Sequence, residues 1–306
     1  MKLGNVSLYE EAIQKNYILQ DELAFAKQTE AVVKAVLSDS SIRFVTLSGP
    51  TCSGKTTTAA RIIKDLQRAG KRVAVVSFDD FFRNTDTYNR NDVTSDAEKV
   101  DFDSIDALDL PFIHEIIEGI KTGKTVYMPT FDFKRGLRSQ YHILDSKAYD
   151  LFLFEGIQAV YPEITSLFDD RERLSVFSNV FEDVEIAGSY FTSRDVRLIR
   201  RIVRDHRTRG ASPAFTMYLW ASVIANEEKN ILPYAASANF LIDSFLPYEL
   251  HVLRDPFLNV MQELPENSPF AAEKDRLYAQ MMPVTPMSAR YVPSDSICRE
   301  FIGELQ

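Results

Sequence analysis

Eight consecutive residues of this sequence have the types that bind phosphate groups. Residues 49–56 read G-P-T-C-S-G-K-T and satisfy the pattern G-x-x-x-x-G-K-[ST] at every defined position. Glycines let the backbone wrap an anion, and the amides and the following helix N-terminus offer it partial positive charge. Lys55 is expected to reach the β- and γ-phosphates, and the Thr56 hydroxyl is expected to reach Mg²⁺. The predicted nucleotide-binding residues are Gly49, Pro50, Thr51, Cys52, Ser53, Gly54, Lys55, Thr56 and Thr57.

The context of this phosphate-binding loop (P-loop) separates it from a chance match. An apolar strand is predicted over residues 42–47 before it, and a helix over residues 56–68 after it. A P-loop by itself indicates only a nucleoside triphosphate. The guanine motif N-K-x-D of GTPases and the S-G-G-Q signature of ABC-type ATPases do not occur in the sequence. A small-molecule kinase is therefore the leading class.

Carboxylates follow two of the predicted strands directly. Asp79 and Asp80 come after a strand at residues 72–78, and Glu155 comes after a strand at residues 151–154. Ligands of open α/β sheets bind beyond the carboxyl ends of the strands. Asp79 could there accept the proton of an acceptor hydroxyl, and Glu155 could orient the hydration shell of Mg²⁺. An Asx turn or a helix cap is the alternative explanation for the aspartate pair.

A predicted helix at residues 193–210 is rich in arginine. Its arginines are Arg194, Arg197, Arg200, Arg201, Arg204, Arg207 and Arg209. Four of them share one helical face by the spacing i, i+3, i+4, i+7. The nearby acids Asp195 and Asp205 do not balance this charge. We therefore predict a lid that closes on phosphates, with a solvated charged surface as the alternative.

Composition limits the class of protein. The chain has 306 residues, of which 45% are hydrophobic and 26% charged, so a folded α/β protein is expected. The formal net charge of −9 argues against broad nucleic-acid binding. No apolar run approaches the length of a membrane span. Two cysteines and no visible signal peptide suggest the cytoplasm. The sequence leaves a homo-oligomer open.

Alternating strands and helices predict an α/β fold of the P-loop NTPase type, a three-layer sandwich with a mainly parallel sheet and an Arg-rich helical lid. Further strands are expected at 126–128 and 240–243, further helices at 7–38, 111–120 and 212–225, and a loop at 79–109. The predicted division of the chain is an N-terminal helical extension (1–40), a kinase domain (41–255) with its lid (193–230), and a C-terminal tail packed on that domain (256–306).

A set of motifs in fixed order resembles the uridine kinase branch of the phosphoribulokinase/uridine kinase family. The segments are 49–57, 78–82 (FDDFF), 101–103 (DFD), 107–109 (ALD), 129–133 (PTFDF), 154–157 (FEGI) and 195–205 (DVRLIRRIVRD). Later segments, including 244–249 (SFLPYE) and 296–303 (SICREFIG), resemble bacterial uridine kinase-like proteins that usually carry a synthetase-like N-terminal region. With about forty residues before the P-loop strand, this chain is expected to lack that region.

The resemblance implies roles for individual residues. Asp79, rather than Asp80, matches the catalytic carboxylate of the family, and ATP and Mg²⁺ are the implied cofactors. Substrate-binding positions are Phe82 in the nucleoside pocket, Phe131 near the base, and Asp103 and Arg197 at the ribose. The lid arginines, grouped with the catalytic residues Asp79 and Lys55, are Arg200, Arg201 and Arg204.

One departure from the family concerns the choice of substrate. The histidine that reads the pyrimidine edge in family members is Gly136 here, although His142 lies nearby in the sequence. A pocket without that polar group loses discrimination between bases. The leading functional hypothesis is a nucleoside kinase that acts on the 5′-hydroxyl of a uridine- or cytidine-like substrate, and two alternatives stay open. These are a kinase for another small alcohol, such as a sugar, sugar phosphate or pantothenate-like acceptor, and a non-catalytic nucleotide-sensing module.

Overall fold

The computed structural model describes residues 2–3, 11–84, 104–133 and 135–304. A five-stranded sheet forms its centre, and every neighbouring pair of strands in it is parallel. The order across the sheet is β10 (Phe240–Asp243), β7 (Arg173–Asn179), β2 (Phe44–Ser48), β6 (Leu151–Glu155) and β3 (Val73–Ser77). The carboxyl ends of all five strands therefore meet at one edge of the sheet.

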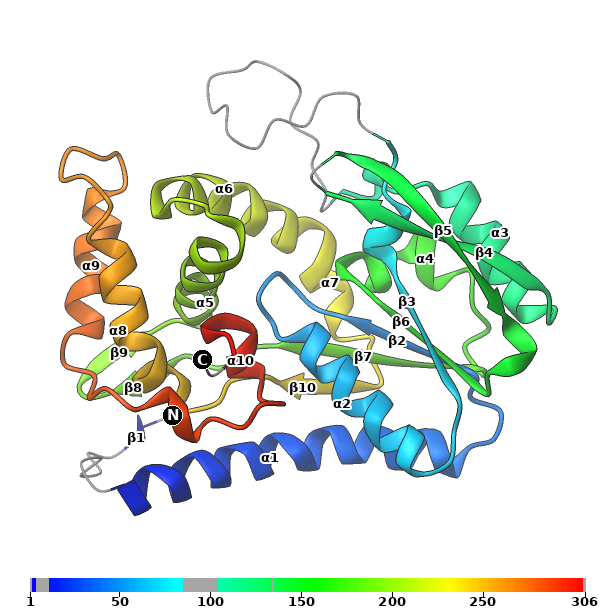
Figure 1. Ribbon diagram of the computed structural model, residues 1–306, viewed down its shortest axis with the longest axis horizontal. Helices are drawn as coiled ribbons and strands as arrows, with labels where there is room; N and C mark the ends of the chain where they lie inside the picture. Colours follow the sequence, from blue (N-terminus) through cyan, green and yellow to red (C-terminus); the bar gives the residue numbers. More distant parts are fainter. Residues whose placement is uncertain (1, 4–10, 85–103, 134, 305–306) are drawn as a thin grey trace.

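Both faces of the sheet are covered, because its strands send alternate apolar side chains to opposite sides. Val45 and Leu153 join the core beneath α1 (Glu11–Ser38) and α2 (Lys55–Arg68), whereas Phe44 and Phe154 join the core beneath α3 (Leu110–Lys121). Figure 1 shows α1 running as one long helix along the sheet with α2 beside it. This is the three-layer arrangement that the sequence predicted.

The strand predicted at residues 126–128 does not belong to the parallel sheet. It is part of β4 (Thr125–Asp132), which pairs antiparallel with β5 (Leu137–Asp145) in a separate two-stranded sheet. Exposed and buried residues largely alternate along β4, as expected for a strand that buries one face only. This hairpin contacts η1 (Phe78–Phe81), which directly follows β3. The hairpin thereby reaches the carboxyl edge of the sheet.

Sequence analysis also missed β7, which lies near the middle of the sheet between β10 and β2. Its residues Arg173–Asn179 mix charged, polar and apolar types, so they lack the continuous apolar run of β6. A second missed element is the hairpin of β8 (Val184–Ile186) and β9 (Ser189–Phe191), on which β1 (Lys2–Leu3) pairs. This hairpin stands between β7 and the arginine-rich helix.

The second half of the chain is mainly helical. Its helices are α4 (Pro162–Thr165), α5 (Ser193–Arg209), α6 (Pro213–Asn226), α7 (Leu232–Ala235), α8 (Glu249–Met261), α9 (Ala271–Met281) and α10 (Ile297–Ile302). Short helical turns are η2 (Ile105–Ala107), η3 (Ser146–Ala148), η4 (Ile157–Val160), η5 (Glu227–Ile231) and η6 (Ala289–Tyr291). Among the described residues, no helix is both long and apolar enough for a membrane crossing.

Specific contacts tie α1 to the end of β10 and to the segment that follows it. The Gln28 side chain of α1 donates to the carbonyl of Asp243 and accepts from its amide, at 3.0 and 2.8 Å. The Tyr248 hydroxyl donates to Glu22 at 2.6 Å. The predicted boundary between residues 255 and 256 falls inside α8, whose residues pack in the main core. The helix therefore joins the expected kinase domain and tail without a break.

Candidate active site

The P-loop connects β2 to α2, as its motif predicted. A Cβ atom on Gly49 would lie 2.0 Å from the carbonyl oxygen of Ser178, and one on Gly54 would lie 2.9 Å from the Ile297 side chain. Both positions therefore need glycine, because neighbouring atoms fill the space. The Ser178 hydroxyl at the end of β7 also donates to the Ser53 carbonyl at 2.8 Å. The loop is thus fixed by β7 and by the C-terminal helix α10.

Lys55 lies among the carboxylates of the site. Its Nζ donates to the Pro50 carbonyl at 2.9 Å, inside the P-loop. Burial lowers the pKa of Lys55, while the negative charges of Glu155, Asp79 and Glu300 oppose that shift. Asp79 and Glu155, which the sequence analysis selected from two other segments, therefore lie within electrostatic range of the Lys55 ammonium group. Glu300 is an unexpected member of this set.

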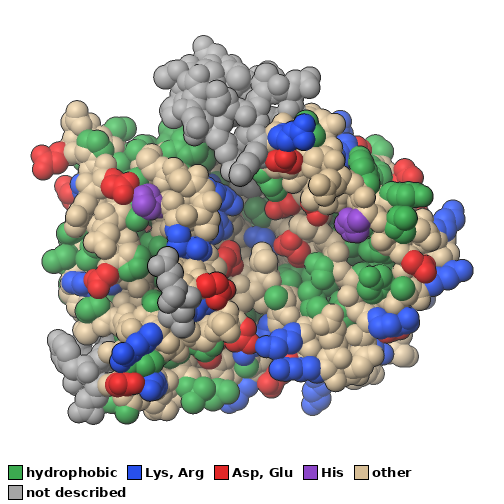
Figure 2. Space-filling model, in the orientation of Figure 1, with side chains coloured by type: hydrophobic (Ala, Val, Ile, Leu, Met, Phe, Trp, Pro, Cys, Tyr) green, Lys and Arg blue, Asp and Glu red, His purple; other side chains and the backbone are tan. Residues whose placement is uncertain are grey.

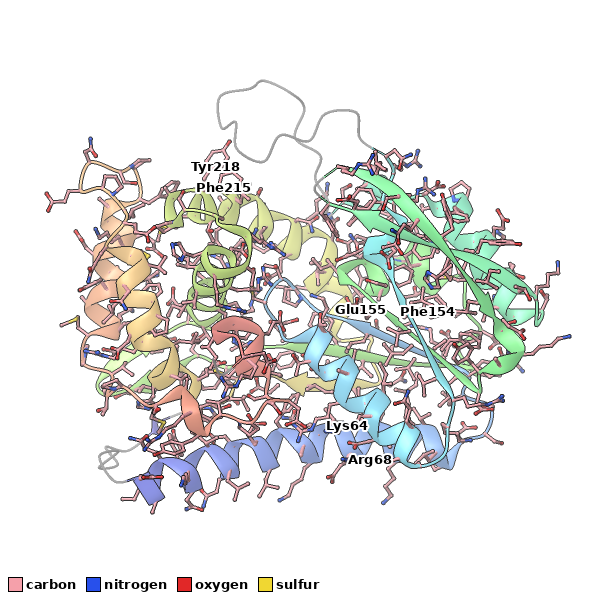
Figure 3. All side chains as sticks on the ribbon, in the orientation of Figure 1. Lys64, Arg68, Phe154, Glu155, Phe215 and Tyr218 are labelled. Atoms are coloured by element: carbon pink, nitrogen blue, oxygen red, sulfur yellow. The ribbon has the colours of Figure 1, made fainter. Side chains whose placement is uncertain are left out.

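Glu155 ends β6 at the edge of the sheet and is labelled in Figure 3. Its Oε1 accepts a hydrogen bond from the Ser77 hydroxyl at 2.7 Å, which fixes one side of the carboxylate. Thr56 is exposed in the first turn of α2. Mg²⁺ keeps several waters and uses few protein ligands beside substrate phosphates. One oriented carboxylate and one accessible hydroxyl fit that donor set. No group of three or more potential metal ligands was found among the described residues.

The neighbouring aspartates Asp79 and Asp80 have different surroundings. Asp80 is half-buried, and its Oδ1 accepts from the backbone amide of Phe131 at 3.0 Å. Burial also raises the pKa of Asp80. This contact ties the end of β3 to the hairpin. Asp79 is exposed and lies within electrostatic range of Lys55. Asp79 is therefore near Lys55, whereas Asp80 forms a structural hydrogen bond with the hairpin.

Three phenylalanines form an aromatic cluster between η1 and the hairpin. Ring centroids of Phe82 and Phe131 are 5.5 Å apart, and Phe133 lies 5.9 and 5.1 Å from them. Phe82 and Phe131 are only 2% and 5% exposed, whereas Phe133 is partly exposed. The two predicted aromatic residues therefore meet, together with a third that sequence analysis did not select.

Two further predicted positions concern the acceptor. Asp103 lies outside the described residues. Gly136 lies in the turn between β4 and β5, where its amide donates to the Asp132 carbonyl at 2.8 Å. His142 is exposed on β5 and lies within electrostatic range of Asp80. The described part of the hairpin turn thus offers no imidazole at the family position.

Three arginines of α5 are buried and therefore do not form a solvated surface. Arg197, Arg200 and Arg201 are 1%, 0% and 7% exposed, and α5 packs against α6, α8 and α10. Part of the positive charge of α5 is paired, because partners arrive from distant segments. Ion pairs join α5 arginines to Glu227, Glu228, Glu249 and Glu300. These glutamates lie 30 to 96 residues from their arginines in the sequence, so a count of nearby charges does not include them.

Arg200 is the most enclosed of these residues. It forms a paired hydrogen bond with Glu249, at 3.0 and 2.9 Å, and both side chains have no exposed surface. Its remaining donors reach the carbonyls of Cys52 and Ser244, at 2.9 and 2.7 Å. The guanidinium therefore binds the backbone of the P-loop, which is a positioning contact and differs from the lid role predicted for it.

Arg197 makes a similar buried contact. It donates to Glu227 at 2.7 Å and to the Thr51 carbonyl at 3.4 Å, while its Nε has no hydrogen-bond partner among the described residues. The Trp220 ring centroid lies 5.6 Å from its guanidinium. A ribose role for Arg197 stays a prediction, carried here by that one remaining donor.

Arg201, Arg204 and Arg209 share a single carboxylate. Asp205 lies 3.3, 2.8 and 3.3 Å from them, respectively. Arg204 and Arg209 are within electrostatic range of Cys52 in the P-loop. Three arginines around one aspartate leave net positive charge beside the loop, which is suited to an anion. Figure 2 shows blue and red side chains on the walls of the hollow at the middle of this face.

Comparison with known proteins identifies the family of this chain. Residues 44–248 match the model of the phosphoribulokinase/uridine kinase family. The chain belongs to that family. A uridine-cytidine kinase B from Dictyostelium discoideum is 32% identical over 197 residues, covering 64% of this chain and 72% of the relative. A uridine kinase from Lactobacillus johnsonii is 31% identical over 166 residues, covering 54% and 69%.

A solved structure described as a possible uridine kinase from Bacillus stearothermophilus is 17% identical. It covers 49% of this chain and 79% of its own, with a TM-score of 0.38. Family membership identifies this chain as a phosphotransferase with a P-loop nucleotide site, and so confirms the class predicted from the sequence. The family match ends before α8, so it does not include Glu249 or Glu300.

Proposed function

We propose that this protein transfers the γ-phosphoryl group of ATP to the 5′-hydroxyl of a uridine- or cytidine-like nucleoside. The observation that carries the proposal is the placement of Asp79 and Glu155 within electrostatic range of Lys55 at the carboxyl edge of the sheet. A phosphoryl-transfer site needs a proton acceptor, a metal-orienting carboxylate and a cation on the phosphates. These three side chains supply all of them.

Each residue then has a distinct task. Asp79 accepts the proton of the acceptor hydroxyl and orients its oxygen toward the γ-phosphorus. Lys55 leaves the Pro50 carbonyl to bind the β- and γ-phosphates, since phosphate oxygens are stronger acceptors for an ammonium group. Thr56 and Glu155 would hold Mg²⁺, which would supply positive charge against that of the phosphates. Arg201 and Arg204 stabilise the charge that spreads over the transferring group.

The acceptor pocket in this proposal lies beside the hairpin. Phe82, Phe131 and Phe133 give it an apolar aromatic wall. Asp103 and Arg197 remain the proposed ribose contacts, with the Nε of Arg197 available as a donor. A second candidate, a kinase for another small alcohol, is favoured by one observation. Gly136 supplies no side chain that could read a pyrimidine.

A screen of acceptors tests the proposal. ADP release is measured with MgATP and a panel of pyrimidine and purine nucleosides, sugars, sugar phosphates and pantothenate, with Lys55→Ala as the background control. We expect turnover with pyrimidine nucleosides above the background. Turnover restricted to a sugar, sugar phosphate or pantothenate would support the second candidate instead. Release that no acceptor stimulates would contradict both kinase proposals.

A further inference from the structure

The C-terminal helix α10 is built into the phosphate site. Ile297 fills the space beside Gly54, and the Phe301 ring centroid lies 5.0 Å from the guanidinium of Arg200. Arg207 of α5 donates to the carbonyls of Phe301 and Glu300, at 3.1 and 3.2 Å. Ile297 and Phe301 have no exposed surface. The P-loop and α5 thus fix α10 from two sides.

This packing directs one carboxylate toward the phosphate-binding cations. The Oε1 of Glu300 lies 3.6 Å from Nη1 of Arg204, and Glu300 is within electrostatic range of Lys55. Its Oε2 is buried and has no hydrogen-bond partner in the described part of the chain. A negative charge here repels phosphate, so Glu300 must contribute an effect that offsets this repulsion.

We propose that Glu300 is a positioning residue that holds Arg204 in the orientation required at the transferring phosphoryl group, an inference that rests on the function proposed for Arg204 above. Asp205 cannot fix Arg204 alone, because Arg201 and Arg209 also use its carboxylate. Glu300 approaches a nitrogen of Arg204 that Asp205 does not bind. Arg204 is therefore held between two carboxylates from different segments.

The charges around Arg204 agree with this arrangement. Burial opposes its charge, but Cys52, Asp205 and Glu300 together raise the pKa of Arg204 above its usual range. A flexible side chain with four carbon–carbon and carbon–nitrogen rotors loses much of its freedom when both ends of its guanidinium are bound. Orientation is then fixed before the nucleotide arrives, and preorganised charge is what stabilises a transition state.

The proposal predicts that rate and affinity respond differently to loss of the carboxylate. Glu300→Gln removes the ion pair that holds Arg204, so the rate of phosphoryl transfer should fall, roughly tenfold. The same change removes a negative charge near the phosphates, so the affinity for MgADP should not decrease. If Glu300 were needed only for folding, its replacement would lower the transfer rate, the MgADP affinity and the thermal stability together.

The experiment compares Glu300→Gln and Glu300→Asp with Glu304→Gln, whose side chain is exposed in the same segment. MgADP affinity is measured by calorimetry, thermal stability by the melting temperature, and turnover as ADP release with the best acceptor, or with water when no acceptor is used. The MgADP titrations need no acceptor. Their results can therefore be interpreted even if the nucleoside proposed as substrate is wrong.

We expect lower turnover in both Glu300 variants, MgADP affinity no weaker than in the wild type, and a Glu304→Gln variant that behaves as the wild type does. Turnover within twofold of the wild type in Glu300→Gln would overturn the proposal. Parallel losses of turnover, MgADP affinity and melting temperature in both Glu300 variants would overturn it as well, because they indicate a structural role.

Discussion

Two groups of arginines on α5 have the same chemistry and opposite surroundings. Arg197 and Arg200 each have a buried glutamate of their own, and both donate to carbonyls of the P-loop. Arg201, Arg204 and Arg209 divide one aspartate and keep surplus charge beside the loop. The first group therefore holds the loop in shape, and the second group is the one that we propose to contact the phosphates.

The largest expected effect concerns the first group. Arg200→Met leaves Glu249 buried without its partner and the Cys52 carbonyl without its donor, so we expect stability to fall by about 3–5 kcal/mol. Adding Glu249→Leu removes the unpaired charge and should restore part of that loss. Chemical denaturation measures both variants. If Arg200→Met alone were as stable as the wild type, the distinction between the two groups of arginines would be lost.

Substitutions in the second group should lower the rate of phosphoryl transfer and leave the stability of the fold nearly unchanged. Arg204→Ala is expected to lower turnover by roughly 10²–10³-fold, the usual effect of removing a charge-stabilising donor. Its melting temperature should stay close to that of the wild type. Arg194→Ala on the same helix is the control, because its ion pair with Glu228 is exposed on both sides. Steady-state kinetics with the best acceptor decide the outcome. Equal turnover in Arg204→Ala and Arg194→Ala would assign Arg204 to structure.

A smaller effect extends the comparison to a half-buried carboxylate on α1, that of Asp21. Burial, with a contribution from Glu22, raises the pKa of Asp21 to about 7, although the Tyr248 amide donates to it at 3.0 Å. The folded state thus binds a proton that the unfolded state releases at lower pH. This stabilisation is complete below about pH 4 and is lost as the pH rises through about 7.

Asp21→Asn should therefore gain thermal stability over the wild type as the pH increases. We expect the difference in melting temperature to grow by a few degrees between pH 5 and pH 8. Glu30→Gln, an exposed change on the same helix, should show no such trend. A pH-independent difference for Asp21→Asn would contradict the raised pKa.

The sequence predicted those parts of the molecule that rest on local pattern. The P-loop, its flanking strand and helix, and the buried strands at β3 and β6 follow from motif and apolar runs. β7 was missed because Arg173 and Ser175 interrupt its apolar pattern, although β10 and β2 pair with its two edges inside the sheet. Whether such a segment forms a strand depends on its tertiary contacts, and these cannot be seen in the sequence of the segment alone.

The same limit applies to the site. Glu155 and Asp79 could be found because each follows an apolar strand directly. Glu249 and Glu300 carry no such signal, since they meet Arg200 and Arg204 only when the chain folds back from segments 49 and 96 residues away. Local charge counting therefore overestimated the free positive charge of α5. Phe133 lay inside a recognised motif, and its position two residues after Phe131 was the signal that could have selected it.

The most direct test of the account compares Asp79→Asn with Asp80→Asn in single-turnover phosphoryl transfer, with MgADP affinity measured for both. Asp79 lies within electrostatic range of Lys55, and Asp80 accepts a hydrogen bond from the hairpin amide of Phe131. We predict that Asp79→Asn slows transfer by roughly 10²–10⁴-fold and keeps its affinity for MgADP and its melting temperature. Asp80→Asn should keep most of the transfer rate. Near-normal transfer in Asp79→Asn together with an inactive Asp80→Asn would contradict the central assignment of the catalytic carboxylate.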